Sequence, residues 1–201
     1  IKVGIIGVGN CAKSLVEGIQ YYKTNPDDTV GLMYESIGGY TVNEIEFVVG
    51  FDVDRRKVNK PLVDALRAAP NCAMDHVEEI LENGSNTSGC VKKGAMVYSG
   101  PELDGVAPHM LDYPEEVSFR TGAEAAKSFD DIVNIVKDTE VDVLINYAPV
   151  GSEKLSKFYI DVALKAGVHF VNCIPTVIST KDTKRIEQKF IDAGLTIVGS
   201  D

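Results

Sequence analysis

The stretch Val3–Ser14, VGIIGVGNCAKS, decides the fold. Its apolar start is typical of a buried strand, the small residues from Gly7 to Ala12 stop that strand, and a helical pattern follows. This is the G-x-G-x-x-A form of the dinucleotide fingerprint, in the strand–turn–helix context that the motif requires. Gly7 permits the tight turn, Gly9 lets the backbone approach a pyrophosphate, and Ala12 lets the helix pack closely on the strand. We therefore expect a bound dinucleotide to contact Gly7, Val8, Gly9, Asn10 and Cys11.

The next strand of the pattern, Ile45–Asp52, is rich in β-formers and ends in an acid. In the ordinary motif this acid follows the glycines by about 20 residues. Here Asp52 comes 45 positions after Gly7, so we expect an insertion over residues 21–44, in the form of an ordered loop. Asp52 would accept hydrogen bonds from the adenosine ribose, with Val53 beside it, which favours NAD over NADP. The alternative is that Arg55 and Arg56 bind the 2′-phosphate of NADP.

Regular alternation of helices and strands returns after residue 122 and predicts a doubly wound, Rossmann-like parallel sheet with helices on both faces. The expected elements are a helix around Ile132–Val136, a strand over Val141–Asn146, a helix from Leu155 to Ala163, a strand over Val168–Asn172, a helix over Lys181–Ala193 and a strand over Leu195–Val198. Residues 55–121 are less regular. There we expect helices over Pro61–Ala69 and Val77–Glu82, a turn-rich stretch at Asn83–Gly89, a strand at Met96–Ser99 and a loop at Gly100–Gly105.

Three strand ends in this pattern carry small or polar residues. In doubly wound sheets ligands bind beyond the carboxyl ends of the strands, so these loops are candidate cofactor contacts. The first of these loops, Ala148–Gly151, would pass under a ribose of the cofactor. Asn172 and Asp201 would hold the carboxamide or polarise a substrate oxygen. Turn formation alone also explains such residues. The contacts expected here are Ala148, Pro149, Val150, Gly151, Asn172, Ser200 and Asp201.

Composition narrows the classes of partner. The formal net charge of −10 disfavours nucleic acids and acidic membrane surfaces, and no run of about 18 apolar residues is present. None of the four cysteines forms a C-x-x-C pair, which favours reduced thiols and a cytoplasmic protein. The three histidines are scattered, so no metal site is predicted. No nucleophile-elbow motif appears either.

Further segments extend the pattern beyond a generic dinucleotide fold. They are Leu15–Gly18, Val30–Met33, Phe51–Asp54, Gly100–Gly105, Pro149–Glu153, Lys157–Tyr159 and Phe170–Asn172 with Pro175. Together with the glycine loop, they resemble the bacterial and archaeal branch of the myo-inositol-1-phosphate synthase family. The resemblance runs from Val3 to Asp201, although residues 68–96 match little.

The resemblance implies an isomerase that uses NAD in an internal redox cycle. Such an enzyme oxidises C5 of glucose 6-phosphate, closes the ring by an intramolecular aldol step and reduces the product to 1D-myo-inositol 3-phosphate. Its catalytic lysines and a catalytic αβ domain are expected after residue 201, so residues 1–201 would form the NAD-binding domain and be inactive alone. The family is typically tetrameric, so an oligomer is expected for the whole protein.

Two other functions fit the same residues. One is an NAD(P)-dependent dehydrogenase of the homoserine or semialdehyde type, which would show net hydride transfer. The other is a non-catalytic NAD-binding module.

Overall fold

A computed structural model describes residues 1–75, 89–106, 108–122, 126–176 and 184–199. Its centre is a six-stranded parallel sheet in the order β3-β2-β1-β4-β5-β6. This order is that of two mononucleotide-binding halves joined between β1 and β4, so the predicted fold is confirmed. The strands are β1 (Lys2–Ile6), β2 (Glu46–Asp52), β3 (Val91–Ser99), β4 (Val143–Asn146), β5 (His169–Asn172) and β6 (Ile197–Gly199).

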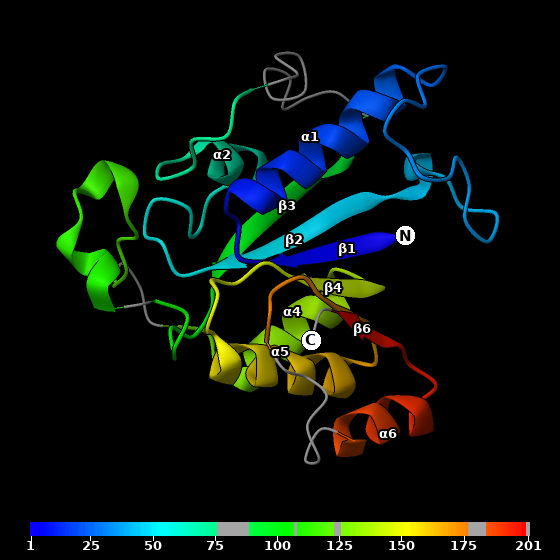
Figure 1. Ribbon diagram of the computed structural model, residues 1–201. Helices are drawn as coiled ribbons and strands as arrows, with labels where there is room; N and C mark the ends of the chain where they lie inside the picture. The colour runs from blue at the N-terminus through cyan, green and yellow to red at the C-terminus, as the bar shows by residue number, and fades with distance from the viewer. Residues whose placement is uncertain (76–88, 107, 123–125, 177–183, 200–201) are drawn as a thin grey trace.

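Helices cover both faces of the sheet (Figure 1). One face carries α1 (Asn10–Thr24) and α2 (Leu62–Arg67), and the other carries α4 (Phe129–Asp138), α5 (Glu153–Ala166) and α6 (Lys184–Asp192). Each face has its own apolar core. The 3.6-residue period of α1 puts Ala12, Val16 and Ile19 on the sheet, where all three are buried. Helix propensity and packing therefore agree along this segment.

The strand register brings the carboxyl ends of the strands to one edge. Ile6 pairs with Phe51 on one side and with Asn146 on the other, and Asn146 pairs with Asn172. The loops that follow β1, β2, β4 and β5 consequently meet at this edge. The strand ends singled out from the sequence lie where a ligand of a doubly wound sheet binds.

The insertion before β2 lies at the opposite end of the sheet. Helix α1 runs to Thr24, and the loop after it ends in the 3-10 turn η1 (Val42–Glu44), where Thr41 and Glu44 form a capping box. Because this loop joins the end of α1 to the start of β2, it sits at the amino ends of the strands (Figure 1). The late arrival of Asp52 therefore leaves the carboxyl edge unchanged.

The less regular region holds one confirmed helix, α2, and one strand that is longer than expected. Strand β3 starts at Val91 and not at Met96, because it pairs with Phe47 at Val91 and with Val49 only at Met96. Gly94 lies in the bulge with φ +83°, which breaks the apolar alternation. The helix expected at Val77–Glu82 and nearly all of Asn83–Gly89 fall outside the described residues. Two 3-10 turns follow β3, η2 (Pro108–Asp112) and η3 (Glu115–Val117).

Within the described part of the chain, no helix combines the length and apolar character needed to cross a membrane.

Candidate dinucleotide-binding site

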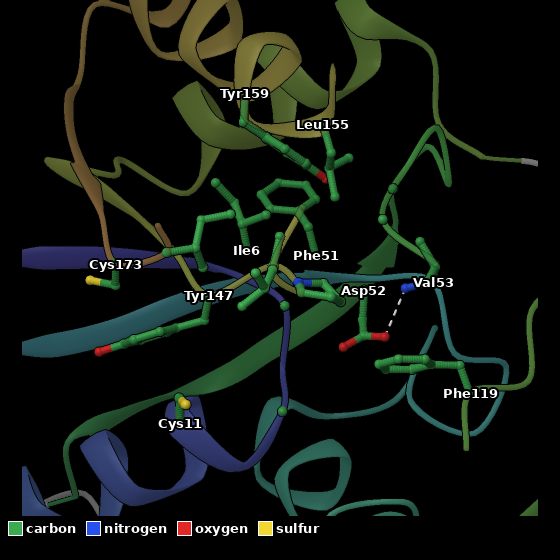
Figure 2. Close-up of a pocket in the computed structure, with 18 of the residues that line it drawn as sticks. Ile6, Cys11, Phe51, Asp52, Val53, Phe119, Tyr147, Leu155, Tyr159 and Cys173 are labelled. Carbon is green, nitrogen blue, oxygen red and sulfur yellow. Dashed lines mark hydrogen bonds between the residues drawn. The ribbon is translucent and has the colours of Figure 1, made fainter. Parts of the chain in front are cut away.

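A cavity of about 370 Å³ opens at the carboxyl edge of the sheet (Figure 2). Its walls come from the glycine loop, the end of β2, the loop after β3, Phe119 and the loops after β4 and β5. Eight of the expected contacts line it: Gly7, Gly9, Cys11, Asp52, Val53, Ala148, Pro149 and Val150. Val8, Asn10, Gly151 and Asn172 lie in or next to the same loops but do not line the cavity. Ser200 and Asp201 fall outside the described residues.

The two glycines of the loop have different roles: Gly7 permits the sharp turn, and Gly9 leaves space at the start of α1. Gly7 has φ +82°, and a Cβ there would lie 2.6 Å from the Tyr147 carbonyl oxygen. Gly9 is the N-cap of α1, and a Cβ there would meet no protein atom within 4 Å. Glycine has no side chain to cap the helix, and among the described residues no other side chain caps this helix end. The first N–H groups of α1 are therefore left to a ligand or solvent, as in an anion-binding helix terminus.

Asp52 both lines the cavity and holds the glycine loop. One carboxylate oxygen accepts the Val8 N–H at 2.8 Å, and the other accepts the N–H groups of Val53 at 2.7 Å and Asp54 at 2.8 Å (Figure 2 draws the Val53 bond). A carboxylate offers about four acceptor positions, so one remains for a ligand hydroxyl. Its side chain is 6% exposed and lines the cavity, so the cavity gives access to it.

Lys57 was missed from the sequence and lies directly beneath this loop. Its ammonium donates to the Val8 carbonyl at 2.8 Å and to Asn71 Oδ1 at 2.9 Å, and lies 3.9 Å from Asp52 Oδ2. Burial lowers its pKa, while the charges of Asp52 and Asp54 act in the opposite direction. Both backbone groups of Val8 are thus fixed, its N–H by Asp52 and its C=O by Lys57. In the sequence, Lys57 stands among other charged residues after β2, and such a pattern is typical of a solvated turn.

The two arginines after β2 are occupied by carboxylates. Arg56 binds Asp54 through two bonds, Nε to Oδ1 at 2.9 Å and Nη2 to Oδ2 at 2.6 Å. Arg55 donates from Nη2 to Glu115 Oε1 at 2.9 Å. The buried Asp54 also accepts the Arg120 N–H at 3.1 Å. These pairs connect the end of β2 to the segment around η3.

The loops after β4 and β5 are held by a buried amide pair. Asn146 Nδ2 donates to Asn172 Oδ1 at 2.9 Å, and Asn172 Nδ2 donates to the Ile174 carbonyl at 2.8 Å. Asn172 is 2% exposed, so its side chain shapes the Cys173–Pro175 turn that lines the cavity. Its direct contact with a cofactor stays a prediction.

Tyr147 and Cys173 form the wall opposite Asp52, with Cys11 below them on α1 (Figure 2). Burial raises the pKa of Tyr147 to about 12, and the neighbouring Cys173 thiol acts in the same direction. Desolvation at the cavity wall also raises the pKa of the Cys173 thiol, although the residue as a whole is exposed. This wall is therefore uncharged at neutral pH, and the charges of the cavity gather at its Asp52 end.

The chain matches curated bacterial proteins over its whole length. It is 41% identical to the inositol-3-phosphate synthase of Corynebacterium glutamicum and 40% identical to those of Mycolicibacterium smegmatis and Mycobacterium tuberculosis. The chain is a homologue of inositol-3-phosphate synthases. It spans about half the length of these relatives, 50% in each case. No protein-family model matches the chain.

Solved structures agree with this homology. The crystal structure of Ari2 superimposes with a TM-score of 0.77 at 25% identity, and the chain covers 52% of it. A myo-inositol-1-phosphate synthase-related protein from Thermotoga maritima superimposes with a TM-score of 0.71 at 19% identity, and the chain covers 54% of it. The second likeness shows the fold alone. The curated relatives, at 40–41% identity, confirm the family resemblance drawn from the sequence.

Proposed function

We propose that the chain binds NAD in this cavity, as the cofactor-binding part of an enzyme that converts glucose 6-phosphate to 1D-myo-inositol 3-phosphate. The observation that carries the proposal is that the N-terminus of α1 at Gly9 and the Asp52 carboxylate at the end of β2 open on one cavity. Homology to inositol-3-phosphate synthases supports the reaction. The fit of NAD rests on residues of this chain: open space at Gly9, a spare acceptor on Asp52 and a largely apolar wall.

The residues divide the binding task. The N–H groups at Gly9, Asn10 and Cys11 would hold the pyrophosphate, because they combine free donors with the positive end of the α1 dipole. Asp52 would accept a hydroxyl of the adenosine ribose at its remaining acceptor position, with Val53 at its side. The turn Ala148–Gly151 and the turn after β5 would enclose the nicotinamide half. Ser200 and Asp201 remain proposed contacts of that half.

The charges around Asp52 support NAD over NADP. A 2′-phosphate would approach a carboxylate that is held in place by three N–H groups and is not free to turn away. The arginines that could neutralise that phosphate are bonded to Asp54 and Glu115. Moving Arg55 or Arg56 to the 2′-phosphate would break a charge-assisted hydrogen bond to its carboxylate partner. We therefore assign NAD as the cofactor.

When bound, NAD supplies a hydride acceptor for C5 of the sugar and a hydride donor for the cyclised product. The chain contributes shielding: Leu155 and Tyr159 close one side of the cavity and are nearly buried themselves. Exclusion of water keeps a reactive ketone from side reactions. Lys57 is committed to the Val8 carbonyl and Asn71. On the family resemblance, we place the lysines that assist cyclisation in a catalytic αβ domain after residue 201.

We further propose that the whole protein is a cytoplasmic oligomer. Cys11, Cys72 and Cys173 are exposed free thiols, which suits a reducing compartment. The oligomer follows from the family resemblance.

The reaction is tested by incubating the whole protein with glucose 6-phosphate and a catalytic amount of NAD. We expect inositol phosphate to form without net NADH. NADH accumulating in proportion to consumed sugar would show a dehydrogenase and overturn the synthase proposal. Residues 1–201 alone should bind NAD without turnover, and cyclisation by them would show that the lysines are misplaced.

A further inference from the structure

Phe119 is an aromatic side chain at the cavity with no apolar core behind it. It is half-buried and lines the cavity beside Val53 and near Asp52 (Figure 2). Among the described residues it belongs to neither of the two apolar cores nor to the side chains packed against them. An aromatic ring that faces a cavity without supporting a core points to a role in the cavity.

The backbone on both sides of Phe119 is fixed by charged residues from the end of β2. Arg56 Nη2 donates to the Ser118 carbonyl at 2.6 Å. The Arg120 N–H donates to Asp54 Oδ2 at 3.1 Å, and the Arg55 N–H donates to the Arg120 carbonyl at 2.7 Å. Ser118 is also bonded to the Met110 carbonyl. The ring of Phe119 is thus held by a backbone that is hydrogen-bonded on both sides, at Ser118 and at Arg120.

The anchor is an unusual one for a surface segment. Asp54 is fully buried, at 0% exposed, and both of its oxygens are bonded to the Arg56 guanidinium. Burying a carboxylate costs free energy unless it is paired and hydrogen-bonded, which this one is. Because Asp54 lies two residues after Asp52, the same turn positions both the ribose-binding carboxylate and the aromatic ring.

The order of groups in a dinucleotide identifies what Phe119 would meet. Next to the adenosine ribose comes the purine base, a flat ring that binds well by stacking on an aromatic side chain. Val53 lies beside Phe119, and Pro101 and Gly105 also line the cavity; none of the three carries a charge. We propose that Phe119 is the adenine-stacking residue of this site and that the Asp54–Arg56 pair is its positioning device. This inference rests on the proposed binding of NAD.

The test is the affinity for ADP-ribose, which carries the adenosine and pyrophosphate but no nicotinamide, measured by calorimetry. Phe119→Ala should weaken binding about 5- to 150-fold, the range for loss of one base–aromatic stack. Phe119→Tyr keeps the ring and should bind within about twofold of the parent, by the same stacking argument. Leu111→Ala is the matched control, because Leu111 is an exposed side chain of the same segment, at 57%.

The positioning role is tested by a double-mutant cycle with Arg56→Ala. The double variant should lose less affinity for ADP-ribose than the sum of the losses in Arg56→Ala and Phe119→Ala, because each single change removes the same stack. If the parent binds NAD and Phe119→Ala binds ADP-ribose as tightly as the parent does, the inference is overturned and the cofactor assignment stands. Full additivity in the cycle would overturn the positioning role. If the parent binds neither NAD nor ADP-ribose, the proposed function itself fails.

Discussion

The two glycines of the first loop should separate stability from cofactor binding. In Gly7→Ala the new Cβ would lie 2.6 Å from the Tyr147 carbonyl oxygen and 2.9 Å from its carbon, at φ +82°. A non-glycine residue at positive φ costs about 1 kcal/mol, and overpacking against backbone costs about 1–3 kcal/mol. We therefore expect the free energy of unfolding to fall by about 2–4 kcal/mol.

Gly9→Ala is the contrasting change. Its φ of −97° suits alanine and its Cβ meets no protein atom, so only the weaker N-cap preference is lost, about 1 kcal/mol or less. The methyl group would occupy the space through which a pyrophosphate approaches the backbone, so NAD affinity should fall about tenfold or more.

Urea unfolding gives the stability of each variant, and calorimetric titration gives its affinity for NAD. A Gly9→Ala variant that binds NAD as the parent does would refute the assignment of the pyrophosphate to this loop. A Gly7→Ala variant as stable as Gly9→Ala would refute the steric argument.

Three further predictions concern the surrounding network. NADP should bind the parent protein about tenfold or more weakly than NAD, measured by calorimetry, because Asp52 repels a 2′-phosphate; equal affinities would contradict the assignment. Burial raises the pKa of Asp54, but the bonds from Arg56 and Arg120 outweigh it and the net pKa is lowered. Its contribution to stability is therefore complete above the ordinary pKa of about 4 and lost as pH falls through the lowered value; Asp54→Asn should lose less stability than the parent between pH 6 and 3 in urea unfolding. Asn172→Ala should cost about 1–3 kcal/mol, because it leaves one N–H of the buried Asn146 amide without its acceptor; an unchanged urea midpoint would show that the amide pair is dispensable.

The sheet could be predicted from sequence because its signals are local. The fingerprint fixed β1, the turn and α1 together, and the acid at Asp52 marked the end of β2 despite the insertion. Strand β3 was only partly predicted, because the bulge at Gly94 interrupts its apolar alternation. Hydrophobic periodicity predicts a strand where successive side chains alternate regularly between the two faces of the sheet. A bulge interrupts that alternation.

The site was predictable where a motif names a residue or where a strand end places a loop. Gly7, Gly9 and Asp52 belong to a known pattern, and all three line the cavity. Lys57 and Phe119 were missed because their roles depend on contacts across the fold, with Val8 in one case and with the Asp54–Arg56 pair in the other. A charged residue after a strand and an aromatic residue in an irregular segment carry no sign of such contacts in the sequence.

The most direct test of the central claim is a calorimetric titration of NAD into the 201-residue chain. The account predicts one saturable site per chain, with NAD affinity about tenfold or more weaker in Gly9→Ala while that variant loses about 1 kcal/mol of stability or less. Absence of saturable binding by a folded parent chain, or equal binding by the parent and Gly9→Ala, would contradict it.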